Sequence, residues 1–153
     1  MDILRNLILF VHISAAAMLV GANTGALRNL RQTKELGQQS FLVAAQDAAL
    51  RGKILGICSM MTLMSGVMLI LKMGGMAVAP INYHIALGLM LVAVAVSAII
   101  MRPNGMKVLA LAQNESFDPR SVDPLIKKLA MGQGILHLLW VVILLLMLFR
   151  IYR

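Results

Sequence analysis

Residues 81–101, INYHIALGLMLVAVAVSAIIM, contain no aspartate, glutamate, lysine or arginine. An α-helix rises about 1.5 Å per residue, so about 20 apolar residues cross the roughly 30 Å hydrocarbon core of a bilayer. Three more stretches share this character, and the four expected spans cover residues 7–27, 54–71, 81–101 and 129–149. The sequence therefore predicts an all-α integral membrane protein, an up-and-down four-helix bundle that forms a single domain over residues 1–153.

The composition supports this class, because 60% of the 153 residues are hydrophobic and only 13% are charged. Between the spans, residues 27–36 are expected to continue the first helix as far as Gly37. The RPNG segment at 102–105 is expected to end the third span. Asp123 is expected to cap the last helix, with Pro124 in its first turn.

Basic residues are concentrated in two of the connections. Ten of the 14 lysines and arginines follow the first and third spans: Arg28, Arg31, Lys34, Arg51, Lys53, Arg102, Lys107, Arg120, Lys127 and Lys128. Positive residues favour the cytoplasmic side, so both termini are expected to be periplasmic, in a bacterial-type inner membrane. The net charge of +8 is thereby explained by topology and contact with lipid, and no nucleic-acid partner is expected.

Two histidines occur in matching apolar settings, FVHISAAAMLV at 10–20 and NYHIALGLMLV at 82–92. His12 and His84 are each followed by Ile, and by Met, Leu and Val at the sixth to eighth positions. A duplication would explain the match, and the fold would then consist of two parallel αα-hairpin repeats. Ionisable groups inside a membrane span are functional candidates by default.

Depth and helix order suggest a haem b site. His12 is expected about 9 Å and His84 about 5 Å below the outer membrane boundary, on diagonal helices. Two imidazoles in this arrangement are suitable axial ligands for haem iron, or for another metal. Four further residues complete the predicted site: Ala16 and Gly88 would leave room for the ring, and Arg5 and Lys72 would contact the propionates. The protein would then transfer electrons or accompany a redox complex.

Three alternatives remain open on the same residues. A neutral histidine also packs between helices by hydrogen bonding, and this is favoured for the deeper His137 over a haem ligand or quinone donor. The protein would then be a structural accessory subunit of a larger membrane complex, or a homo-oligomer. The small residues that would seat the neighbouring helix are Ala17, Gly21 and Gly25. Copper transport is a weaker alternative, since the second span carries Met60, Met61, Met64 and Met68.

The sequence contains little that indicates catalysis. The spans hold no carboxylate for a proton relay, and no nucleophile–histidine–acid arrangement or phosphate loop is present. The single cysteine, Cys58, rules out a disulfide within the chain and is expected to be a packed thiol. We do not expect an enzyme, unless a bound cofactor supplies the chemistry.

One helix carries a family resemblance. The segment VHISAAAMLVGANTGALR at 11–28 is similar to the first helix of the copper-resistance D-type membrane proteins and of the four-helix J-type protoporphyrinogen oxidases, which bind haem b. His12 and Gly21 match that pattern, whereas Leu19 stands where the families have tryptophan. The resemblance implies a small bundle that binds haem or copper near the membrane surface, with His12 as a ligand. Because the oxidases' intramembrane lysine is also missing, the resemblance implies the architecture and not the reaction.

Overall fold

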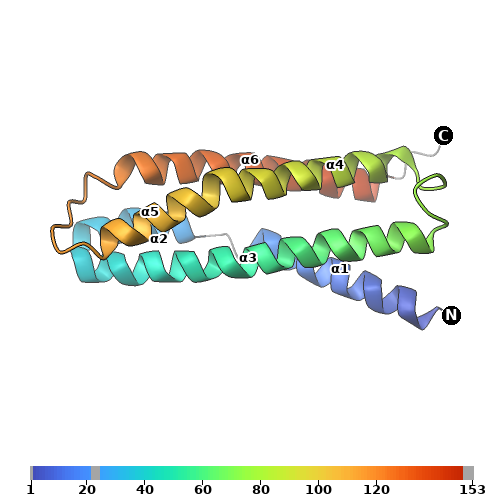
Figure 1. Ribbon diagram of the computed structural model, residues 1–153, viewed down its shortest axis with the longest axis horizontal. Helices are drawn as coiled ribbons and strands as arrows, with labels where there is room; N and C mark the ends of the chain where they lie inside the picture. The colour runs from blue at the N-terminus through green and yellow to red at the C-terminus, as the bar shows by residue number, and fades with distance from the viewer. Residues whose placement is uncertain (1, 22–24, 150–153) are drawn as a thin grey trace.

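The computed structural model describes residues 2–21 and 25–149, and the regular structure in these residues is helical. The elements, in chain order, are α1 (Ile3–Gly21), α2 (Ala26–Thr33), the 3-10 helix η1 (Lys34–Leu36), α3 (Gln38–Lys72), α4 (Ile81–Val96), the π-helix η2 (Ser97–Met101), α5 (Arg102–Ala112) and α6 (Asp123–Leu148). Figure 1 shows them as long, roughly parallel rods. The all-α four-helix prediction is confirmed.

Four helical segments in the described residues are long and apolar enough to cross a membrane. They are α1 with the helical segments that follow it, within the range Ile3–Leu36, and the ranges Gln38–Lys72, Ile81–Ala112 and Asp123–Leu148. The start of α1 and the end of α6 lie at the same end of the molecule as the α3–α4 connection (Figure 1). The chain is therefore organised as a multi-pass membrane protein.

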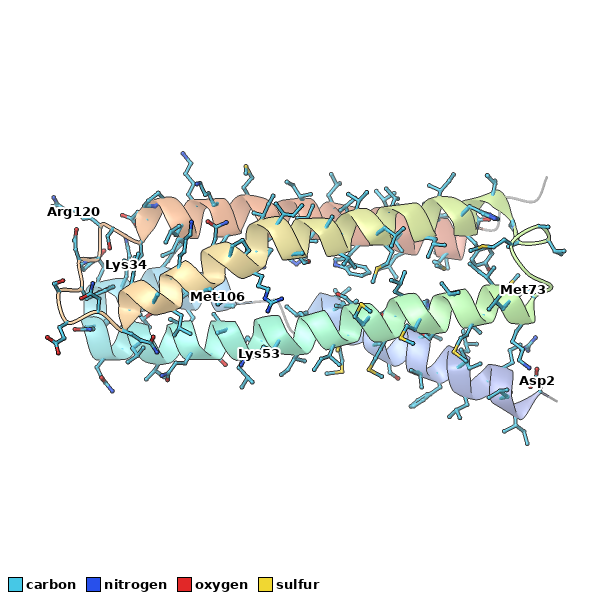
Figure 2. The ribbon with its side chains drawn as sticks, in the orientation of Figure 1. Asp2, Lys34, Lys53, Met73, Met106 and Arg120 are labelled. Carbon is cyan, nitrogen blue, oxygen red and sulfur yellow. The ribbon has the colours of Figure 1, made fainter. Side chains whose placement is uncertain are left out.

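The helices are longer than a bilayer is thick. The 35 residues of α3 extend about 52 Å at about 1.5 Å per residue, against a hydrocarbon core of roughly 30 Å. The apolar span expected at 54–71 forms only the second half of α3, and Lys53 lies near the middle of the helix (Figure 2). A bilayer around the apolar half of α3 leaves the other half projecting from it, on the side of the basic connections.

This projecting end has its own hydrophobic core, which α2, the first half of α3, α5 and the start of α6 enclose. Its buried members are Leu30, Phe41, Ala44, Ala45, Val108, Ala112, Val122, Ile126 and Leu129. Phe41 is fully buried and stacks on Phe117, with 5.0 Å between the ring centroids. The projecting end therefore folds as a small water-soluble bundle would, by burying apolar side chains.

Polar contacts close the far end of this bundle. Lys34 Nζ donates to Asp123 Oδ1 at 2.6 Å, and Gln38 Nε2 donates to the carbonyl oxygens of Ala112 and Asn114. The Asp123 carboxylate raises the pKa of Lys34 by this hydrogen bond, so Lys34 is protonated and can donate at neutral pH. The expected capping role of Asp123 is wrong: α6 has no side-chain cap, because this carboxylate binds Lys34 instead.

Two expected helix boundaries are also wrong. Gly25 has a left-handed φ of 92° and precedes a separate helix, α2, so residues 27–36 do not simply continue α1. Conversely, Pro103 does not end the third span, because the π-helix η2 widens the turn before it, with the Arg102 N–H bonded to the Ser97 carbonyl. A widened turn removes the clash between a proline ring and the preceding turn. Asn104 Nδ2 then donates to the Ile100 carbonyl at 2.6 Å.

Inside the membrane the helices associate as two antiparallel pairs. α1 packs chiefly on α3, and α4 packs chiefly on α6. A second core joins the pairs, and its buried residues are Leu19, Cys58, Ala86, Met90, Ala93, Leu136, Trp140 and Ile143. The pairing is compatible with the two-hairpin repeat, which stays a prediction. Beyond Leu19 toward the start of the chain, α1 diverges from the α4/α6 pair (Figure 1).

We expect Phe41→Ala to destabilise the projecting bundle by about 3–5 kcal/mol, because it empties a fully buried site and removes the stack with Phe117. Thermal unfolding of the purified protein in mild detergent, followed by circular dichroism, measures the effect. Leu36→Ala is the matched control, since Leu36 is 70% exposed and should change stability by about 0.5 kcal/mol or less. Equal effects of the two variants would contradict a packed core outside the membrane.

Candidate functional site

His12 lies on the face of α1 that packs against α3. The buried residues of α1 are Ile8, Ala15 and Leu19, and His12 is half-buried among them at three- and four-residue spacing. Its Nδ1 lies 3.0 Å from the carbonyl oxygen of Thr62 and 3.1 Å from Ser65 Oγ. A carbonyl oxygen only accepts hydrogen bonds, so Nδ1 carries the proton in this bond and Nε2 keeps its lone pair.

The α3 side of this contact is built from small and hydroxyl residues. Thr62 and Ser65 are buried, and their hydroxyls donate to the carbonyls of Cys58 and Met61 one turn earlier, at 2.8 Å and 2.5 Å. A Cβ at Gly66 would lie only 3.2 Å from His12 Cε1, so this glycine makes room for the imidazole. Thr62 and Ser65 are three residues apart and therefore share one face of α3, but the sequence alone does not reveal that His12 is their partner.

His84 has a different environment. The buried residues of α4 are Asn82, Ala86, Met90 and Ala93, which share one face of the helix. His84 is two residues from both Asn82 and Ala86, so it lies on the opposite face, half-buried, with Nδ1 3.3 Å from its own helix's Pro80 carbonyl. Gly88 is on that same outer face, where an added Cβ would meet open space. The structure therefore directs His12 toward α3 and His84 away from the core that α4 shares with α6.

The remaining predicted site residues are spread over the molecule. His137 is half-buried on α6, and Ala16 is half-buried on α1. Arg5 is exposed, and its backbone N–H donates to the Asp2 carboxylate at 3.2 Å. Lys72 lines a cavity of about 270 Å³ between α1 and α3, together with Ile8, Met68 and Leu71. Because Ile8 precedes His12 by four residues, this cavity adjoins the face of α1 that carries the histidine.

The predicted row of small residues, Ala17, Gly21 and Gly25, does not form the contact with α3. Ala17 and Gly21 are exposed on α1, and Gly25 lies outside that helix. The face that packs on α3 is instead the one with His12, Ala15 and Leu19. A role for this row in contact with another protein stays a prediction.

The methionines of α3 line its surface. Met60, Met61, Met64 and Met68 are 51%, 44%, 61% and 47% exposed, respectively. Within the described residues, no group of three or more histidine, cysteine or acidic side chains gathers as a metal site would require.

Asn82 is a buried polar residue that no sequence motif marks. Its side chain is inaccessible to solvent, and Nδ2 donates to the carbonyl oxygens of Leu146 at 2.7 Å and Phe149 at 3.5 Å. Carbonyls at the end of a helix have no partner within the helix, so this amide caps α6 from α4. Asn82 thus fastens the outer end of the α4/α6 pair, while its Oδ1 has no hydrogen-bond partner among the described residues.

Comparison with known proteins assigns the chain to no family. No protein-family model, curated protein or solved structure matches the chain. The resemblance of residues 11–28 to the haem-binding and copper-resistance families therefore stays a prediction, and the functional argument rests on the geometry around His12.

We expect Gly66→Leu to separate α1 from α3, because the new side chain occupies the space of the His12 ring. The expected cost is about 1–3 kcal/mol, measured as a lower midpoint of thermal unfolding in detergent. Gly56→Leu is the matched control on the same helix, since nothing lies within 4 Å of a Cβ there. Both variants gain the same helix propensity, so a similar midpoint for the two would show that His12 does not pack against Gly66.

Proposed function

We propose that the protein binds haem b, or a metal ion, through His12 and serves in electron transfer or beside a redox complex. The observation that carries the proposal is the state of His12: a protonated Nδ1 held by a backbone carbonyl, and an Nε2 without a hydrogen-bond partner in the described residues. Histidines that ligate metals commonly donate their second ring nitrogen to a carbonyl or carboxylate, which fixes the tautomer.

The surroundings of His12 provide two further features of a binding site. The cavity beside Ile8 gives apolar walls, and its volume of about 270 Å³ is close to the lower end of the range of about 300–1,000 Å³ for small-molecule sites. Lys72 adds a positive charge at that cavity, as a propionate or another anionic group requires. Arg5, also toward the start of α1, is the second candidate cation.

His84 enters the proposal as the second axial ligand. Its Nδ1 also faces a carbonyl, which leaves Nε2 as the basic nitrogen. Because His84 lies on the outer face of α4, we base the proposal on His12 and expect His84 to matter only if the ligand binds two imidazoles. A bound haem would supply one-electron chemistry at its iron.

The proposed orientation in the membrane is based on the distribution of basic residues. The projecting bundle carries the ten basic residues of the two long connections, so we place it in the cytoplasm and both termini in the periplasm of a bacterial-type inner membrane. His12 and the cavity at Lys72 then lie toward the periplasmic side, where a redox partner would have to approach.

A second candidate function is that of a structural accessory subunit. It is favoured by the same hydrogen bonds, because the contacts of His12 with Thr62 and Ser65 join α1 to α3 whether or not a ligand is present. In that case the histidine is a packing residue, and the protein contributes surface to a larger membrane complex.

The deciding experiment is a reduced-minus-oxidised visible spectrum of the purified protein, with iron and copper measured by elemental analysis. We expect a Soret band, α and β bands, and near one iron per chain. His12→Ala should abolish the bands, because it removes the ligand nitrogen. Copper at a similar ratio, without a Soret band, would instead identify a copper site.

Two controls separate ligation from packing. Ser65→Ala removes one hydrogen-bond partner of His12 but keeps the Thr62 carbonyl, so it should retain the bands. His84→Ala should leave single-histidine ligation intact and should shift the bands if two imidazoles bind. A colourless, metal-free protein that takes up neither added haem nor copper would favour the accessory subunit.

A further inference from the structure

A row of exposed apolar side chains follows α3 over nearly its whole length. This α3 stripe consists of Val43, Leu50, Ile54, Ile57, Met61, Met64, Met68 and Leu71, which are between 36% and 62% exposed. With Asp47 included, the positions alternate in steps of four and three residues. This is the a/d pattern of a coiled coil, with a period of 3.5 residues and one polar interruption.

Lipid accounts for only part of the stripe. From Ile54 onward the residues lie in the apolar half of α3, where an exposed methionine or leucine needs no protein partner. Val43 and Leu50 lie in the projecting half, before Lys53, and each is 58% exposed. No acyl chain reaches them there, yet they continue the period of the membrane half. A period of 3.5 residues drifts by about 20° per heptad on a straight helix, and two helices that wind around each other keep such residues in contact along their length.

The opposite side of the projecting half is already occupied. Phe41, Ala44 and Ala45 are buried in the core that α3 shares with α2 and α5. In the membrane, Thr62 and Ser65 face α1. Neither set belongs to the α3 stripe. Met68 and Leu71, at the end of the stripe, line the cavity beside Ile8 of α1, so a partner can cover the stripe from Val43 to Met64 without displacing any helix of the bundle.

We propose that the α3 stripe binds a second copy of this chain, forming a parallel pair of α3 helices across a twofold axis normal to the membrane. Two copies inserted in the same orientation bring each stripe position opposite its own counterpart. Val43 and Leu50 are then buried outside the membrane, where apolar burial stabilises association. The proposal does not depend on whether His12 binds a ligand.

Charge on the stripe favours a second copy. Asp47 is its polar interruption, and its Oδ2 accepts a hydrogen bond from Arg51 Nε at 2.7 Å, with the two side chains 39% and 41% exposed. In the twofold pair each Asp47 lies opposite its counterpart, and because Arg51 of the same chain already neutralises each carboxylate, the two copies meet there without net charge. A chain with a net charge of +8 therefore presents a neutral surface to its copy at this point. An unpaired Asp47 would require a basic partner surface, and the ion pair with Arg51 removes that requirement.

Cysteine cross-linking in native membranes tests the geometry. In a full-length chain with Cys58→Ser, we expect Val43→Cys and Leu50→Cys to form disulfide-linked dimers on mild oxidation. Gly52→Cys is the matched control, because it lies two residues from Leu50 on another face of α3 and its Cβ meets open space. Equal cross-linking at Leu50→Cys and Gly52→Cys, or none at either, would overturn the proposal.

Association itself is measured by sedimentation in mild detergent and by energy transfer between labelled copies in lipid vesicles. Leu50→Glu should weaken the dimer at least about tenfold, because it removes two buried leucines and places like charges opposite each other. Met106→Glu is the matched control on α5, where Met106 is 63% exposed and off the stripe. Both variants should keep the wild-type helical content. A wild-type protein that is monomeric in detergent and in vesicles, or a dimer unaffected by Leu50→Glu, would overturn the proposal.

Discussion

The difference between helix length and bilayer thickness is the constraint on which the rest of this structure depends. α3 extends about 52 Å, and a bilayer's hydrocarbon core covers roughly 30 Å of it. The remainder must find its stability in water, which it does by burying Phe41, Leu30 and Val108 in a core of its own. The protein therefore has two cores with different physics: hydrophobic burial drives the projecting one, whereas close packing and hydrogen bonds hold the one in lipid.

The contact between His12 and α3 illustrates the second kind of stability. Lipid offers no alternative partner for a ring N–H, so the Thr62 carbonyl and the Ser65 hydroxyl orient the imidazole and fasten α1 to α3. The same bond determines which nitrogen remains basic. One arrangement thus supports both a packing role and a ligating role, and the metal content and visible spectrum separate them. Asn82 makes the corresponding connection between α4 and α6, with backbone carbonyls as its partners.

The way in which α1 packs affects the haem hypothesis. Diagonal helices in a closed four-helix bundle would direct His12 and His84 toward a common centre. Here α1 packs chiefly on α3, and His84 lies opposite the buried face of α4. A site at His12 would accordingly use the α1–α3 groove with Lys72, whereas the centre of the bundle is filled by Met90, Leu136 and Trp140. The α3 stripe shares Met68 and Leu71 with the cavity at Lys72, whereas Val43 and Leu50 lie in the projecting half of α3, so variants at these two positions separate dimerisation from ligand binding.

The sequence by itself determined the helical class, the four apolar segments and the basic side, because hydropathy and charge act over whole segments and need no knowledge of neighbours. The sequence also placed His12 within a span and predicted that Cys58 is a packed thiol. In the structure Cys58 is buried. Only the tertiary structure decided that Asp123 binds Lys34 instead of capping α6, that η2 carries the helix past Pro103, and that His12 contacts Thr62 and Ser65. Each of these depends on a partner that is distant in sequence or on a small change in helix winding. Periodicity predicts which residues share a helix face, but packing decides which neighbour that face meets.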